Sequence, residues 1–595
     1  MQQMRQVDEA TIRAGLRAKL ERLYGAAAAE CEAELNRLIE RYRPVIAAKL
    51  DQGGYAQRIR AGIDQRDVVL IAYGDSISDG PDRSPLQTMG DFVAEYLREA
   101  ITILHLLPFY PYSSDDGFSV VDYRAVDPAL GDWEDLRALG EELRLMFDFV
   151  ANHISARSQW FQRYLDGDPE YAAFFIAADP AADLTAVFRP RALPLLTPFP
   201  KADGSIVHIW TTFSVDQIDL NYANWKVLLK MTGILLEYIA NGASLIRLDA
   251  IGFLWKRIGS SCMGLPETHW VIQLWREVLD LVCPAALLIT ETNVPHQENL
   301  RYFGDGTNEA QLVYQFPLPP LMLHTFYSGN AERLTRWAAK LATPSPATTF
   351  FNFLASHDGI GVLPVSGILE PAELERMVQT VIRRGGRVSY KNNPDGTTRP
   401  YELNIVYYDA LADPQAGEAL NIARFLGAHA IMLALRSLPA IYIHSLLGSR
   451  NDQTGAERTG RARSINREKL RLADLERDLA APDSLRRRVL EGFKELILLR
   501  GSRTAFHPLG GQTVLDAGAA VFALLRYSPD RSQYVLALHN VSDTEQPAVL
   551  DLGAAGRTGF EKAVDLRDGT VYRRMDGVLA IRLKPYQFRW LDLLP

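Results

Sequence analysis

The amino-acid sequence predicts an α/β protein: a parallel (β/α)8 TIM barrel with an inserted subdomain after its third strand, an N-terminal helical extension and a C-terminal antiparallel β domain. Three observations predict this fold. Short apolar runs alternate with helical stretches between residues 66 and 505, a long polar segment interrupts them after the third run, and short alternating segments follow the last helix. The 595 residues suffice for two or three domains.

The first segment, residues 1–65, is predicted to be helical. Ile12, Leu16, Leu20 and Leu23 recur every three to four residues, which places them on one face of a helix running from residue 8 to about 62. We expect this face to pack on the main domain. A subunit contact in a homodimer is the alternative.

Eight apolar runs predict the strands of the barrel, which with its helices spans residues 66–505. The runs are Val68–Tyr73, Ala100–Leu107, Arg144–Val150, Ser244–Asp249, Leu287–Glu291, Gln311–Tyr314, Thr348–Ala355 and Ala440–His444. The long gap at residues 155–225 predicts the inserted subdomain, because structureless loops of that length are uncommon. In residues 506–595, Ala520–Arg526, Gln533–His539 and Val578–Leu583 predict a small β-sandwich.

Composition excludes several classes of function. The net charge of -8 argues against a nucleic-acid partner, because phosphate backbones require a basic surface. Cys31, Cys262 and Cys283 lie too far apart in the sequence to form a zinc-binding motif. Such a low number of cysteines is typical of a protein from a reducing compartment. Neither an apolar leader nor an apolar run of about 20 residues is present. We therefore expect a cytoplasmic protein with no membrane partner, and nothing implies a metal or an organic cofactor.

The most informative residues stand at the carboxyl ends of predicted strands, where barrel enzymes carry out catalysis. Arg247 and Asp249 are two residues apart, so their side chains project to the same side of a strand. An arginine beside a carboxylate lowers its pKa and keeps it ionised, as a nucleophile requires. A structural ion pair at the strand end is an equally good interpretation.

Three further strand ends carry polar residues. Glu291 directly follows buried aliphatic residues, and partial burial would raise its pKa and suit it to donate a proton. His357 and Asp358 could bind sugar hydroxyls, and Asp358 could stabilise positive charge on a sugar ring; a turn is the alternative. His153 could bond a sugar hydroxyl, although a lone histidine here is more often structural.

Together and in this order, these residues resemble the conserved regions of the α-amylase superfamily, glycoside hydrolase family 13. The resemblance spans residues 66–505 and implies that Asp249 is the nucleophile, Glu291 the general acid/base and Asp358 the stabiliser of the transition state. It also implies that the sugar is held by Arg247, His153 and His357. Two carboxyl groups about 5–5.5 Å apart produce double displacement with retention.

Finer motifs resemble the sucrose phosphorylase subfamily. By that resemblance, Asp115 and Arg463 form an ion pair that closes the far end of the glucose site, and Arg191 binds phosphate. Phe213 would stack on the glucose and Gln217 would contact the acceptor. A surface ion pair, a solvated loop arginine and a core aromatic residue are the alternatives. The implied partners are a small sugar substrate and inorganic phosphate.

One departure from sucrose phosphorylases points elsewhere. Sucrose phosphorylases carry a tyrosine shortly after the nucleophile, and Phe253 stands at that position here. The sequence from Leu254 to His269 resembles that of glucosylglycerate phosphorylases. The resemblance implies conversion of 2-O-α-glucosylglycerate and phosphate to α-glucose 1-phosphate and glycerate. A sucrose or glucosylglycerol phosphorylase is the alternative, followed by a hydrolase and, last, a non-catalytic binding relative.

Overall fold

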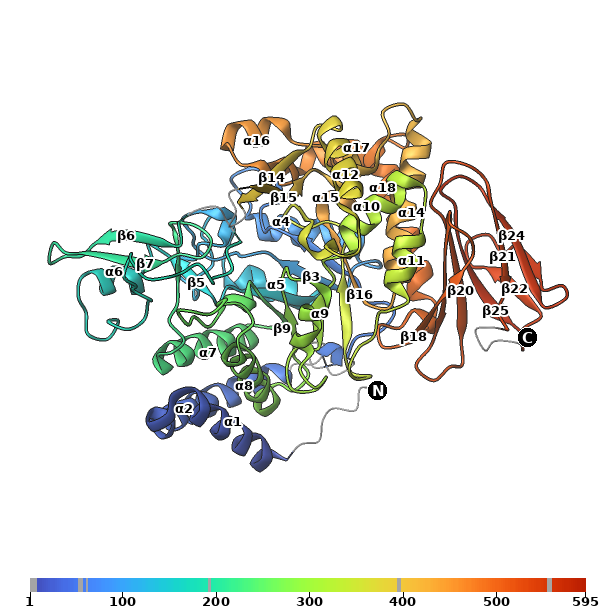
Figure 1. The fold of residues 1–595 in the computed structure, drawn as a ribbon. Helices are drawn as coiled ribbons and strands as arrows, with labels where there is room; N and C mark the ends of the chain where they lie inside the picture. Colours follow the sequence, from blue (N-terminus) through green and yellow to red (C-terminus); the bar gives the residue numbers. More distant parts are fainter. Residues whose placement is uncertain (1–7, 52–56, 60–61, 191–193, 393–396, 554–558) are drawn as a thin grey trace.

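A closed barrel of eight parallel strands forms the centre of the molecule (Figure 1). The computed structural model describes residues 8–51, 57–59, 62–190, 194–392, 397–553 and 559–595. In barrel order the strands are β1 (Val69–Ala72), β16 (Leu438–Tyr442), β12 (Thr349–Asn352), β11 (Leu312–Tyr314), β10 (Leu287–Thr290), β9 (Ala243–Leu248), β4 (Arg144–Phe149) and β3 (Ile103–Leu106). Each of the eight predicted runs overlaps one of these strands, although β9 and β16 begin one and two residues before the predicted runs, so the predicted barrel is confirmed.

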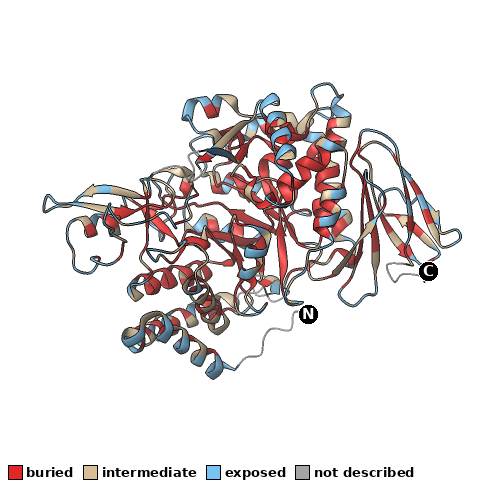
Figure 2. Cartoon of the chain, viewed as in Figure 1, coloured by how far each residue is buried: buried red, intermediate tan, exposed pale blue. Residues whose placement is uncertain are grey.

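The barrel strands are buried along their whole length, as expected for parallel strands enclosed by helices. Long helices cover them from outside with their buried faces, among them α7 (Trp225–Ala240), α8 (Pro266–Val282), α14 (Glu418–Ala434) and α18 (Leu485–Gly501). Figure 2 shows the buried residues concentrated in these strands and on the inner faces of the helices. The barrel and its helices therefore provide a rigid base for side chains at the strand ends.

The N-terminal segment forms α1 (Glu9–Tyr24) and α2 (Ala28–Leu50), which pack on α8 and α7. Leu16 and Leu20 are buried on the predicted apolar face. Lys19 Nζ lies 2.7 Å from Glu277 Oε1 on α8. The end of the predicted helix lies partly outside the described residues, at 52–56 and 60–61. This packing is the one expected, and a homodimer contact remains a prediction.

The segment after β4 leaves the barrel and forms two small antiparallel pairs. β5 (His153–Ser155) pairs with β8 (Gln217–Asp219), and β6 (Leu196–Pro200) pairs with β7 (Ile206–Trp210), with α6 (Gln159–Leu165) between the pairs in sequence. Figure 1 shows this insertion to one side of the barrel. The β5–β8 pair brings His153 and Gln217 to the same end of the barrel.

A second excursion was not predicted. After β12 the chain forms a three-stranded antiparallel sheet of β13 (Ile360–Gly361), β15 (Thr398–Asn404) and β14 (Arg387–Asn392). The β14–β15 hairpin was missed because its polar residues carry no apolar alternation long enough to indicate a strand. It follows Asp358 in the chain and lies next to the residues at the barrel mouth.

The C-terminal domain is antiparallel, as predicted. One sheet has the order β18 (Gly511–Asp516), β19 (Val521–Tyr527), β20 (Tyr534–Asn540), β25 (Phe588–Leu594), β22 (Lys562–Asp565) and β23 (Val571–Arg573), and a second pairs β21 (Gln546–Asp551) with β24 (Val578–Leu583). Buried Arg526 links this domain to the barrel by donating a hydrogen bond of 2.6 Å to the carbonyl oxygen of Ala434 on α14.

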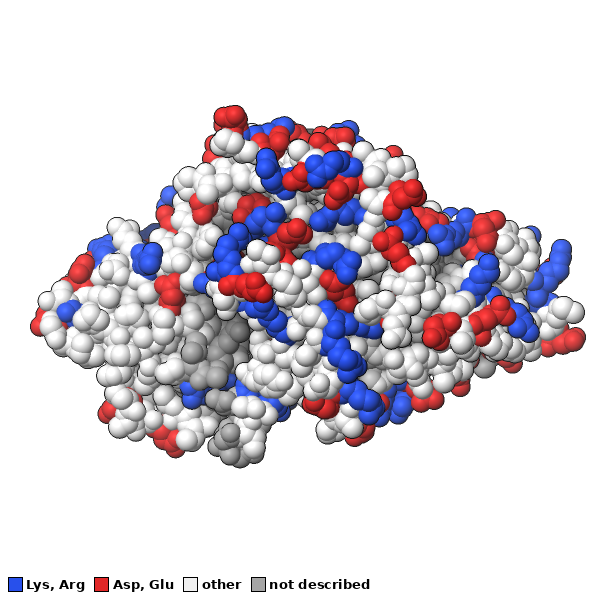
Figure 3. All heavy atoms as spheres, turned by 90° about the horizontal axis from the view of Figure 1, so that it is seen from above, with Lys and Arg blue, Asp and Glu red and all other residues white. Residues whose placement is uncertain are grey.

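The surface charge is mixed. On the face that Figure 3 shows, basic and acidic side chains of the described residues alternate without a continuous basic area. Within the described ranges, the molecule contains no helix long and apolar enough to cross a membrane.

Candidate active site

One pocket at the carboxyl end of the barrel collects the predicted site residues. Ten of them line it: Asp115, His153, Phe213, Gln217, Arg247, Asp249, Glu291, His357, Asp358 and Arg463. They come from segments spread between residues 115 and 463, which the barrel topology brings together. The eleventh, Arg191, lies outside the described residues.

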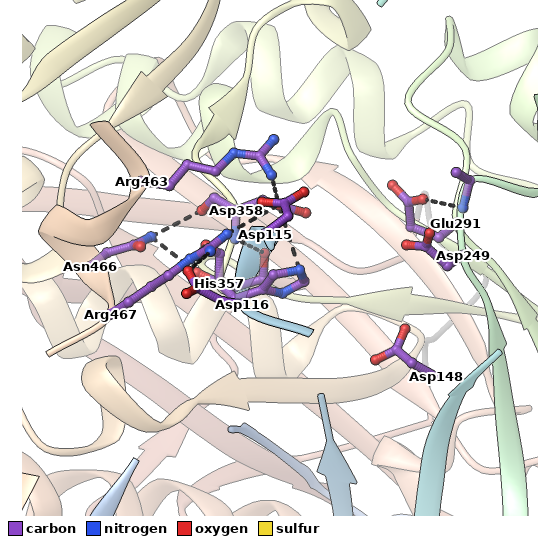
Figure 4. Close-up of polar contacts among 12 residues, drawn as sticks. Asp115, Asp116, Asp148, Asp249, Glu291, His357, Asp358, Arg463, Asn466 and Arg467 are labelled. Carbon is purple, nitrogen blue, oxygen red and sulfur yellow. Dashed lines mark hydrogen bonds and ion pairs between the residues drawn. The ribbon is translucent and has the colours of Figure 1, made fainter. Parts of the chain in front are cut away.

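Arg247, at the end of β9, connects the carboxyl groups of the pocket. Its Nη1 donates to Asp249 Oδ1 at 2.8 Å, and its Nη2 lies 3.9 Å from Glu291 Oε2. The same guanidinium also pairs with Asp148 on β4, whose other oxygen lies 2.8 Å from His105 Nε2 on β3. Figure 4 shows Asp249 and Glu291 on the same side of the site, with Asp148 beneath them. Three adjacent strands therefore hold Arg247 between the two carboxyl groups.

The backbone between the two carboxyl groups is strained. Ala250 follows Asp249 and has a φ of 46°, in the left-handed region that non-glycine residues rarely adopt. Its N–H donates to Glu291 Oε2 at 2.8 Å. Such a conformation costs about 1–3 kcal/mol and tends to occur at functional sites. Here it orients the Glu291 carboxyl group next to Asp249.

Burial raises the pKa of Glu291, as the sequence predicted, although Arg247 opposes this effect. The prediction of a lowered pKa for Asp249 was wrong. Burial raises the pKa of Asp249 too, and the charges of Glu291, Asp148 and Asp358 reinforce this rise against the opposing effect of Arg247. Two adjacent buried carboxylates repel each other, so the pair favours holding one proton. Because the Arg247 hydrogen bond is made to Asp249, the proton is better placed on Glu291.

Asp358 differs from this pair. Its Oδ1 lies 2.5 Å from Arg463 Nη1 and 3.5 Å from His357 Nε2. Burial alone would raise the pKa of Asp358, but Arg463, His357 and Arg247 together hold it far below its usual value. Asp358 is therefore a permanent carboxylate that faces the other two across the site (Figure 4).

The partner of Arg463 is not the one the sequence predicted. Besides Asp358, Arg463 binds Glu402 on β15 through two hydrogen bonds, of 2.7 and 3.0 Å. Asp115 instead accepts a hydrogen bond from Gln217 Nε2 at 3.4 Å. The hairpin that carries Glu402 was not foreseen, so a closer carboxylate than Asp115 was overlooked.

Asp115 lies in a short strained turn. Asp115, Asp116 and Gly117 all have positive φ, of 54°, 50° and 110°. A side chain at position 117 would lie 2.7 Å from the carbonyl oxygen of Pro108, so this turn requires glycine. Asp116 points to Arg467 and forms an ion pair with it. The turn thereby separates two consecutive aspartates, and Asp115 alone of the two lines the pocket.

Aromatic rings form the remaining walls. Phe118 stacks on His357 with 4.8 Å between ring centroids and an interplanar angle of 5°. On the insertion side, the ring of Phe213 lies 5.3 Å from His153 and 5.2 Å from Phe253. Sugar rings bind against such apolar faces while polar groups fix their hydroxyls. The contact between Phe118 and His357 joins two segments far apart in the chain, so the sequence did not reveal it.

A buried ion pair contacts Asn152, the residue that precedes His153 in the chain. Lys256 Nζ lies 2.6 Å from Asp219 Oδ2 and donates to Asn152 Oδ1 at 2.6 Å. The sequence did not predict this pair, because Lys256 is far from Asp219 in the chain. Among the described residues, no group of three or more His, Cys, Asp or Glu side chains could hold a metal ion.

Comparison with known proteins identifies the class. An α-amylase catalytic domain model matches residues 93–367. The chain is 49% identical over 554 residues to a glucosylglycerate phosphorylase of Allomeiothermus silvanus, covering 92% of this chain and 95% of that protein. It is 49% identical over 490 residues to one of Escherichia coli, covering 82% and 87%. The crystal structure of sucrose 6F-phosphate phosphorylase from Thermoanaerobacter thermosaccharolyticum superposes with a TM-score of 0.70 at 25% identity, over 80% of this chain and 94% of that chain.

The barrel, the insertion after its third strand and the three carboxyl groups at its mouth define an α-amylase-type catalytic barrel. The chain belongs to the α-amylase superfamily, glycoside hydrolase family 13. Within that family it is similar over most of its length to the glucosylglycerate phosphorylases.

Proposed function

We propose that this protein is a retaining glycoside phosphorylase that converts 2-O-α-glucosylglycerate and phosphate to α-glucose 1-phosphate and glycerate. The similarity to three glucosylglycerate phosphorylases at 48–49% identity supports the reaction. The observation that carries the mechanism is the single pocket in which Asp249, Glu291 and Asp358 meet around Arg247.

In the first half-reaction, Asp249 attacks the anomeric carbon and Glu291 protonates the glycerate oxygen as the glycosidic bond breaks. This step needs an ionised Asp249 and a protonated Glu291. The contact of 2.8 Å from Arg247 to Asp249, against 3.9 Å to Glu291, favours that distribution. The permanent carboxylate of Asp358 stabilises the positive charge that develops on the sugar ring.

In the second half-reaction, phosphate enters the position that glycerate has left. Glu291, now ionised, accepts a proton as a phosphate oxygen attacks the anomeric carbon, and the bond to Asp249 breaks. Two inversions leave the product in the α configuration. We also propose that Arg191 helps to hold the anion, since a guanidinium donates two hydrogen bonds to an oxyanion.

Sugar recognition is assigned to the remaining pocket residues. Phe213 provides an apolar face for the glucose ring. The hydroxyl groups of the glucose are bound by Asp115, His153, Arg247, His357 and Arg463. Arg463 is bound to both Asp358 and Glu402, and we propose that these paired charges close one end of the pocket. Such a closed end suits a single glucose unit at the non-reducing end of a small donor rather than an internal segment of a polymer.

Gln217 is proposed to contact the acceptor. Phe253 contributes a ring without a hydroxyl to the same pocket, which favours an acceptor other than fructose. We further propose a cytoplasmic location, which is supported by three buried cysteines that are all free.

Purified protein given sucrose, glucosylglycerol or glucosylglycerate, each with and without phosphate, tests this function. We expect glucose 1-phosphate only from glucosylglycerate and only with phosphate. Equal release of free glucose without phosphate would instead identify a hydrolase. Preferred turnover of sucrose or glucosylglycerol would reassign the acceptor.

A further inference from the structure

The β14–β15 hairpin places two cations directly opposite each other. Lys391 on β14 is the cross-strand partner of Arg399 on β15. Like charges in directly opposed positions of an antiparallel pair destabilise it. Among the described residues, neither Lys391 nor Arg399 takes part in an ion pair. Glu402, the acidic residue in the described part of the same hairpin, is bonded to Arg463.

Lys391 is unusual for a lysine because only 8% of its surface is exposed. Its Nζ lies 5.2 Å from the ring centroid of Phe188. Burial, together with the nearby charge of Arg399, lowers the pKa of Lys391. A buried ammonium group is costly unless an anion or a hydrogen-bond acceptor compensates it. A bound anion would provide that compensation.

Both cations lie next to the wall of the catalytic pocket. Phe188, which Lys391 contacts, lines the pocket. Arg399 precedes Tyr401 by two residues on β15, with a shift of the pairing register between them, and Tyr401 also lines the pocket. Lys391 lies directly opposite Arg399, so the two cationic side chains share one face of the hairpin. The pair therefore lies beside the part of the pocket formed by Phe188 and Tyr401.

We propose that Lys391 and Arg399 form an anion subsite that binds the negatively charged group of the acceptor. This inference rests on the proposed function, in which the departing glycerate and the incoming phosphate are both oxyanions. The ligand is the glycerate carboxylate or inorganic phosphate, which share the chemistry that a lysine and an arginine recognise.

Steady-state kinetics of the full-length variants Lys391→Met and Arg399→Gln separate the two sources. The Michaelis constant for glucosylglycerate is measured at saturating phosphate, and that for phosphate at saturating glucosylglycerate. A carboxylate subsite raises only the first constant, a phosphate subsite only the second, and a shared subsite both. We expect a rise of about tenfold or more, typical of a lost charge-assisted hydrogen bond.

Two further variants control the experiment. Lys391→Arg keeps the charge and should retain most of the affinity. Lys201→Met removes a lysine that also lies over an aromatic ring, 5.9 Å from the centroid of Tyr164, in the β6–β7 turn and outside the pocket lining. It should leave both constants unchanged. If Lys391→Met does not fold, Arg399→Gln decides, because Arg399 is exposed and contributes little to the core.

Unchanged constants for both substrates in Arg399→Gln and in folded Lys391→Met would overturn the inference. Failure of the proposed function looks different, because the wild-type protein would then release no glucose 1-phosphate from glucosylglycerate. In that case the phosphate constant, measured with whichever disaccharide is turned over, still tests the subsite.

Discussion

Replacing Glu291 by glutamine removes the proposed proton donor without disturbing its surroundings. The amide oxygen of glutamine can still accept the hydrogen bond that the Ala250 N–H makes at 2.8 Å. Proton transfer by a positioned side chain contributes about 10²- to 10⁴-fold to a rate, or about 3–5 kcal/mol of barrier. We expect the turnover of glucosylglycerate by Glu291→Gln to fall by this factor, with little change in the temperature of unfolding.

The choice of leaving group isolates the role of Glu291. Fluoride leaves without protonation, so formation of the glucosyl enzyme from α-glucosyl fluoride should slow by less than about tenfold in the variant. The pH profile gives a second measure. Burial raises the pKa of Glu291 above 4.5, so wild-type activity persists above that pH and falls on the alkaline side as the proton is lost. That alkaline fall should be absent from Glu291→Gln.

An equal loss of rate with glucosylglycerate and with α-glucosyl fluoride would refute this assignment. So would an unchanged alkaline limb in the pH profile. Either result would mean that Glu291 acts on binding or on the geometry of Asp249, and that another group donates the proton.

Other predictions concern the nucleophile and the packing. Asp249→Ala should abolish turnover while the circular dichroism spectrum stays native; appreciable phosphorolysis would exclude Asp249 as the nucleophile. Asp148→Asn should lower the free energy of unfolding by about 3–5 kcal/mol, because the buried Arg247 guanidinium loses one of its carboxylate partners. The pKa of Asp148 in the folded protein lies below its usual value of 3.8. Its contribution to the free energy of unfolding is therefore present above pH 3.8 and is lost as the pH falls through the lower pKa of the folded state. Acid unfolding of the variant should depend less on pH in this range. Leu20→Ala should cost about 2–5 kcal/mol, because Leu20 of α1 is fully buried in the hydrophobic core, and limited proteolysis of the N-terminal helices would detect the loss.

The barrel could be predicted because each strand is a short apolar run between helices of clear periodicity. The chemistry could be located for a related reason. Parallel strands place their carboxyl ends at one rim, so Asp249, Glu291 and Asp358, each just after a strand, were expected to meet. The pocket contains all three. Their assigned roles stay predictions until the variants are measured.

What the sequence could not predict depends on contacts between distant segments. The sequence predicted Asp115 as the partner of Arg463, whereas the structure pairs Arg463 with Asp358 and Glu402. Glu402 was missed because it lies on a hairpin without a periodic signal. The pKa of Asp249 depends on burial and on three other carboxyl groups, and a nearby arginine in the sequence does not reveal these. The opposed cations Lys391 and Arg399 become adjacent only when β14 pairs with β15.

The configuration of the first-formed product tests the central claim most directly. Proton NMR of the reaction of glucosylglycerate with phosphate, recorded within the first turnovers, distinguishes the two anomers of glucose 1-phosphate. Attack by Asp249 followed by attack of phosphate predicts the α anomer, formed together with one equivalent of glycerate. The β anomer as the initial product would contradict a covalent intermediate on Asp249.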